Sequence, residues 1–151
     1  MRPRRSELEA RYGLISNGSW PRYSEFLVPF IVPYALQSAL LYGGWPTRKI
    51  IMNKDMVTPF TTATNLLISE GCIKFIHSYG GCFNIRNVRG GNQISAHAYG
   101  LAVDINPDTN PLGKPGAMHQ DVVDCFEEAG FVWGGNFKRI DGMHFQYHTE
   151  T

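Results

Sequence analysis

Two histidines and one aspartate in the second half of the chain are residue types that bind metal ions. His97 precedes Asp104 by seven residues, and His144 follows much later. Two imidazoles and a carboxylate suit Zn²⁺, and three protein ligands leave the fourth position open, as in catalytic zinc sites. Spacing alone is a weak signal, because a hydrogen-bonded histidine and a surface carboxylate would produce the same pattern.

Asp141 lies three residues before His144. A carboxylate that stands beside a metal ligand without being one suits a general base, because it can take a proton from an attacking water. We therefore predict a catalytic role for Asp141.

Two predicted strands would position these side chains. In a strand over 101–105, alternation places Asp104 on the face opposite three aliphatic residues. In a strand over 143–147, His144 likewise faces away from the apolar residues, and His148 shares its face as a candidate supporting group. Gly100 allows a tight turn that folds His97 back beside the first strand.

The remaining pattern predicts an α+β fold, a small antiparallel sheet with flanking helices. Apolar spacing indicates helices over 57–69 and 118–129, the second closed by Gly130. Short strands are expected at 49–53 and 83–85, and Gly80-Gly81 is expected to form a turn.

Two stretches of the chain resemble the signatures of a known family. The stretch 95–106, SAHAYGLAVDIN, resembles the SxHxxGxAxD signature of D-Ala-D-Ala carboxypeptidase-type zinc peptidases. The stretch 141–145, DGMHF, resembles their (Asp/Glu)-x-x-His-(Phe/Trp) signature. Segments 79–86 and 131–135 agree as well, so the resemblance covers about residues 45–148. The group includes VanY- and VanX-like enzymes and the L-alanyl-D-glutamate peptidases of phage endolysins, and its wider set includes hedgehog domains.

The resemblance implies a role for each matching residue. It implies one Zn²⁺ held by His97, Asp104 and His144, with Asp141 as the general base. It also implies that Arg86 and Ser95 line the substrate site, with Arg89 as a second candidate for the arginine position. Tyr99 is a further candidate for lining the cleft, because of its residue type, although buried aromatic residues more often fill the core. Arg86 would sit near the substrate carboxylate or the developing oxyanion.

Two departures from the family pattern matter. The predicted base is Asp141, whereas the VanX- and VanY-like enzymes have Glu at this position. In this respect the chain is more similar to the phage endopeptidases. Asn136-Phe137 stands where relatives often have Asp-Trp, so we expect that side of the pocket to differ from theirs.

Length and composition favour one globular unit. The chain has 151 residues, 43% of them hydrophobic and 18% charged. We predict an N-terminal helical and loop extension over residues 1–44, packed on a zinc peptidase domain over 45–151. Three cysteines without a CxxC spacing indicate reduced, mostly buried thiols.

Several partner classes are disfavoured. A net charge of +1 argues against nucleic acid. The most apolar stretch, 26–41, is too short and too polar to span a bilayer, and the N-terminus does not resemble a secretory signal. Together with the resemblance to phage endolysins, this leads us to expect synthesis in a host cytoplasm, release of the holin type and action on bacterial peptidoglycan. A monomer is the expected oligomeric state.

Three functions are compatible with these features. The leading hypothesis is a phage endolysin that cleaves the L-Ala–D-Glu bond of peptidoglycan stems. The second is a D,D-carboxypeptidase that removes terminal D-Ala. The third is a non-catalytic, zinc-containing module that binds the cell wall, against which the presence of Asp141 argues.

Overall fold

The computed structural model describes residues 2–87, 89–91 and 93–148. Its α-helices are α1 (Leu8–Tyr12), α2 (Tyr23–Phe26), α3 (Tyr34–Gln37), α4 (Lys54–Ser69) and α5 (Gln120–Glu128). Its strands are β1 (Leu27–Ile31), β2 (Leu41–Tyr42), β3 (Trp45–Pro46), β4 (Lys49–Asn53), β5 (Tyr79–Gly81), β6 (Ala102–Ile105), β7 (Val132–Trp133) and β8 (His144–Gln146). Four 3₁₀ turns complete it: η1 (Arg5–Glu7), η2 (Ile73–Phe75), η3 (Ala96–Tyr99) and η4 (Gly134–Asn136).

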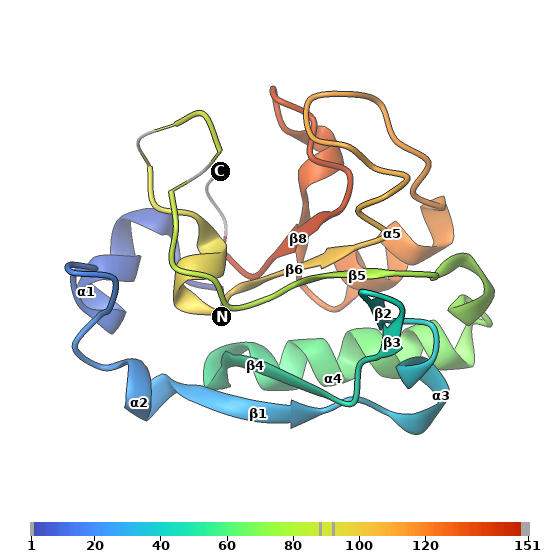
Figure 1. Cartoon of the computed structure of the whole chain (residues 1–151), viewed down its shortest axis with the longest axis horizontal. Helices are drawn as coiled ribbons and strands as arrows, with labels where there is room; N and C mark the ends of the chain where they lie inside the picture. Colours follow the sequence, from blue (N-terminus) through green and yellow to red (C-terminus); the bar gives the residue numbers. More distant parts are fainter. Residues whose placement is uncertain (1, 88, 92, 149–151) are drawn as a thin grey trace.

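The central sheet is antiparallel, with the strand order β5-β6-β8-β7. One of its faces meets the helices: the Phe145 ring stacks on Phe126 of α5 at 4.1 Å between centroids, and Phe126 in turn contacts Phe60 of α4. In Figure 1, α4 runs below the sheet, while the loops after β5 and β6 rise on the opposite side. The predicted α+β class, with a small antiparallel sheet and flanking helices, is confirmed.

The two main helices begin where side chains cap them. The Asn53 side chain accepts a hydrogen bond from the backbone N–H of Asp55 at 2.9 Å, so α4 starts three residues before the predicted 57–69 helix. His119 caps α5 in the same way, its Nδ1 accepting from the N–H of Asp121 at 3.1 Å. Gly130 follows α5 with a φ of +100°, as predicted for a left-handed helix end.

One predicted strand was wrong. The strand is Tyr79–Gly81, not 83–85, and the two glycines expected to form a turn lie inside it. A side chain at Gly80 would come within 2.9 Å of the Asp104 Cβ, and Gly81 has a φ of +116° at a register shift between β5 and β6. The glycines therefore allow β5 to approach Asp104 closely and to pair irregularly with β6. The expectation of a turn failed because adjacent glycines also occur inside strands that need this close approach.

The N-terminal residues pack against the rest of the chain. β1 pairs with β4, and Tyr12, Trp20 and Phe26 form a buried aromatic group. The predicted boundary between residues 44 and 45 falls between β2 and β3, which pair with each other. The division into 1–44 and 45–151 stays a prediction, and residues 1 and 149–151 lie outside the described part of the chain.

No helix among the described residues is long and apolar enough to cross a membrane.

Candidate metal centre

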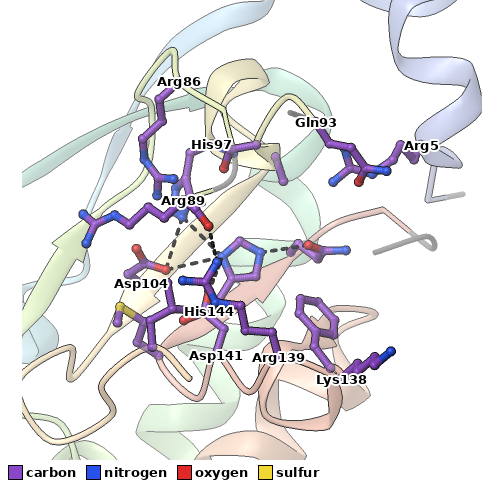
Figure 2. Close-up of a pocket in the computed structure, with 16 residues that line it drawn as sticks. Arg5, Arg86, Arg89, Gln93, His97, Asp104, Lys138, Arg139, Asp141 and His144 are labelled. Carbon is purple, nitrogen blue, oxygen red and sulfur yellow. Dashed lines mark hydrogen bonds and ion pairs between the residues drawn. The ribbon is translucent and has the colours of Figure 1, made fainter. Parts of the chain in front are cut away.

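The side chains of His97, Asp104 and His144 meet on the sheet face opposite the helices. Asp104 on β6 and His144 on β8 are direct cross-strand partners. Direct partners carry their Cβ atoms about 4.5–5.5 Å apart on the same side of the sheet. The two strands therefore bring these groups together, as the alternation predicted, and Figure 2 shows His97 joining them.

His97 reaches the cluster from the short turn η3. Ser95 caps this turn by accepting from the His97 N–H at 3.3 Å, and Gly100 ends it with a φ of +68°. The ring Nδ1 lies 2.7 Å from the Cys82 carbonyl, just after β5. Because a carbonyl can only accept, Nδ1 carries the proton, and the lone pair of Nε2 points at the cluster.

His144 is oriented from the other side. Its Nε2 lies 2.8 Å from Oε1 of Gln146, so Nε2 donates and Nδ1 presents its lone pair. Nε2 of Gln146 in turn lies 3.4 Å from Nδ1 of His148. Gln146 therefore supports His144 directly, and the predicted supporting residue His148 lies one step further away.

The three converging atoms fit a zinc ion. His97 Nε2 lies 3.2 Å from Asp104 Oδ1 and 3.3 Å from His144 Nδ1. Asp104 Oδ1 and His144 Nδ1 lie 3.4 Å apart. Ligands about 2.0–2.2 Å from a tetrahedral zinc lie roughly 3.3–3.5 Å from one another. With a proton outward on each ring, three acceptors face each other, and a cation between them would satisfy all three.

The electrostatics of the cluster also favour positive charge. Burial would raise the pKa of Asp104, but the close contacts with His144 and His97 outweigh burial and hold the pKa below its usual range. Burial would lower the pKa of His144, yet the Asp104 carboxylate raises it overall. A proton or a metal ion is therefore stabilised at this point, and the two compete.

Asp141 stands beside the cluster without joining it. Its Oδ2 lies 3.9 Å from His144 Nδ1, and its Oδ1 is buried with no hydrogen-bond partner among the described residues. The backbone of Asp141 is held by Gly134, whose carbonyl accepts from its N–H at 2.9 Å. Burial raises the pKa of Asp141, a direction that suits a general base working near neutral pH.

These groups line a pocket of about 240 Å³. Ser95, Arg86 and Arg89, three of the predicted substrate-binding residues, line it too. Arg86 is half-buried, its Nε has no partner among the described residues, and its charge opposes the upward pKa shift of Asp141. Arg89 is exposed on the same loop.

Tyr99 does not line this pocket, and its predicted contact with substrate stays a prediction. The ring is 2% exposed and packs against Tyr12 and Trp20, and its hydroxyl donates to the Gly13 carbonyl at 3.0 Å. In the turn Ala96–Tyr99, Tyr99 lies two residues after His97, and it points into the N-terminal aromatic group instead.

Sequence reasoning missed several lining residues. Gln146 shares the strand face of His144, so the alternation could have identified it. Lys138 and Arg139 lie just before Asp141, and this position beside a predicted catalytic residue could have indicated that they line the pocket. The role of the Cys82 carbonyl could not be predicted, because every residue carries a backbone carbonyl. Arg5 and Gln93 also line the pocket without having been predicted, whereas Phe137 lies on the side of the pocket where the sequence placed it.

Comparison with known proteins agrees with this site. Residues 89–147 match a family model described as D-alanyl-D-alanine carboxypeptidase, a range of 59 of the 151 residues that holds the three converging side chains and Asp141. No curated protein and no solved structure gave a match. The family resemblance predicted from the sequence is confirmed, and with it the enzyme class, a metallopeptidase that acts on peptidoglycan.

Proposed function

We propose that this peptidoglycan metallopeptidase is a zinc-dependent endopeptidase of the phage endolysin type, which cleaves the L-Ala–D-Glu bond of stem peptides. The observation that carries the proposal is the convergence of three oriented acceptors beside a buried carboxylate that is not part of the trio. An Asp in that position is the feature shared with the phage enzymes. Action on the wall after release from a host cell belongs to the same proposal.

The residues divide the chemistry between them. His97, Asp104 and His144 would hold the zinc, which when bound lowers the pKa of water from about 15.7 towards 7 and polarises a carbonyl. Asp141, with its raised pKa, takes the proton from the attacking water and passes it to the leaving amine. The Gly134 carbonyl and the His144 N–H hold the Asp141 backbone, which keeps that carboxylate in place.

Arg86 binds the peptide. Its guanidinium lies in the pocket beside Asp141, where a stem carboxylate would find a partner able to form two hydrogen bonds. The half-buried position strengthens such a pair, since water screens it less.

A second candidate is a D,D-carboxypeptidase that removes terminal D-Ala. The specific observation in its favour is the description of the matching family. A terminal carboxylate could occupy the same place beside Arg86, so the pocket accommodates either substrate.

Mass spectrometry of purified peptidoglycan fragments, with and without a chelator, separates these functions. Chelator-sensitive cleavage between L-Ala and D-Glu is the expected result. Loss of terminal D-Ala alone would establish the carboxypeptidase instead. An unchanged fragment spectrum from zinc-loaded protein would contradict both and favour a non-catalytic wall-binding module.

A further inference from the structure

Positive charge is concentrated around the pocket. Five of the chain's fourteen Lys and Arg residues line it, against two of its thirteen acidic residues. The rest of the chain therefore holds nine cations and eleven acids, so it is net negative although the whole chain is +1. A cleft with charge of one sign focuses the field and concentrates ligands of the opposite sign.

Four of these cations form no ion pair with a carboxylate anywhere in the described part of the chain: Arg86, Arg89, Lys138 and Arg139. Three of the arginines outside the pocket, Arg4, Arg11 and Arg22, each pair with a carboxylate. The pocket cations are therefore available to an anion that comes from outside the chain.

The four cations come from two loops. Arg86 and Arg89 belong to the loop after β5, and Lys138 and Arg139 to the loop before β8. The loops touch where Nη1 of Arg139 donates to the Arg89 carbonyl. Figure 2 shows Arg86 and Arg89 on one side of the cluster and Lys138 with Arg139 on the other. Arg86 is half-buried beside Asp141, whereas the other three are exposed at the rim.

We propose that Arg89, Lys138 and Arg139 form a second anion subsite, which binds an additional free carboxylate of the peptide beyond the one held by Arg86. This rests on the peptidase function proposed above. The preferred substrate is then an acidic stem peptide with at least two free carboxylates, and conversion of either carboxylate to a carboxamide weakens recognition. An amide keeps the shape of the group but removes the charge that strengthens its hydrogen bonds to arginine.

Three synthetic peptides test this: the stem tetrapeptide with a free D-Glu α-carboxylate and a free C-terminus, and its two mono-amides. With the wild-type enzyme, each amidation should lower kcat/KM about tenfold, as expected for a lost charge-assisted hydrogen bond. Arg139→Gln should lower kcat/KM for the diacid about tenfold. The two mono-amides should respond differently to this variant. For the mono-amide whose missing carboxylate is the one that Arg89, Lys138 and Arg139 bind, Arg139→Gln should change kcat/KM little.

Matched variants keep the outcome readable. Arg48→Gln removes one charge from an exposed position outside the pocket and should leave all three values unchanged. Lys138→Gln tests the rim without disturbing the contact between Arg139 and Arg89. Equal cleavage of the three peptides, or an equal loss in Arg139→Gln for all of them, would overturn the second subsite and leave the peptidase function intact. No cleavage of any peptide would instead count against the proposed function.

Discussion

The N-terminal region and the pocket treat polar groups in opposite ways. In the N-terminal region, Arg22 pairs with Glu25, and the Tyr12 hydroxyl donates to Asp55 at 2.8 Å, so these groups find their partners within the chain. In the pocket, three acceptors face one another, Asp141 Oδ1 is buried without a partner among the described residues, and four cations lack a carboxylate there.

This contrast separates groups that stabilise the fold from groups that await a ligand. A buried polar atom left unsatisfied costs about 1–3 kcal/mol, so we interpret the unpartnered atoms of the pocket as groups that a bound species completes. Changes in the pocket should therefore alter activity or metal binding, and changes in the N-terminal region should alter stability. Three substitutions test this division.

The largest effect is expected at Asp141. Asp141→Asn keeps the shape of the side chain but removes the base, so kcat/KM should fall about 10²–10⁴-fold. Zinc content and the unfolding temperature should stay at wild-type values, because the carboxylate is not one of the three ligands. Asp124→Asn, on the exposed side of α5, is the matched control. Full activity in Asp141→Asn would remove the proposed mechanism.

An intermediate effect is expected at Gln146. Gln146→Leu removes the oxygen that accepts from His144 Nε2, so zinc affinity should fall about 10–100-fold in competition titrations with a chromogenic chelator. Gln146→Glu retains an acceptor and should keep most of the zinc affinity. Gln120→Leu on α5 is the control and should leave the zinc affinity unchanged. Unaltered affinity in Gln146→Leu would show that the amide does not orient the ligand.

The smallest effect is expected at Tyr12. Burial and the hydrogen bond to Asp55 raise the pKa of Tyr12, so the hydroxyl stays protonated and keeps donating. Tyr12→Phe should lower the free energy of unfolding by about 1 kcal/mol, or roughly 2–4 °C in Tm, with kcat/KM unchanged. A substantial loss of activity with normal stability would break the division between the two regions.

Strand alternation predicted which faces of their strands carry Asp104 and His144. Asp104 and His144 were placed on the faces opposite the apolar residues, and the observed pairing of β6 with β8 puts them directly opposite each other. The argument works because a period of two leaves little freedom once one face is apolar. Gly100 was equally informative, since its left-handed backbone is what brings His97 back to the sheet.

Other features left weaker signals. β5 contains two glycines, and only the tertiary contact with Asp104 explains why a strand needs them there. The side-chain direction of Tyr99 depends on aromatic partners far away in the sequence, such as Tyr12. Arg89 lies about fifty residues before Lys138 and Arg139, and only the fold brings the two loops together. A net charge of +1 for the whole chain gives no indication of this local positive charge.

The direct pairing of Asp104 with His144 has a consequence for folding. If β8 slipped by one residue against β6, His144 would turn towards Phe126 and the helices, while Phe145 would turn towards the pocket. A slipped chain would then lose its core packing and the convergence of His97, Asp104 and His144 together. The correct register of β8 is therefore a condition both for a packed core and for the proposed metal binding.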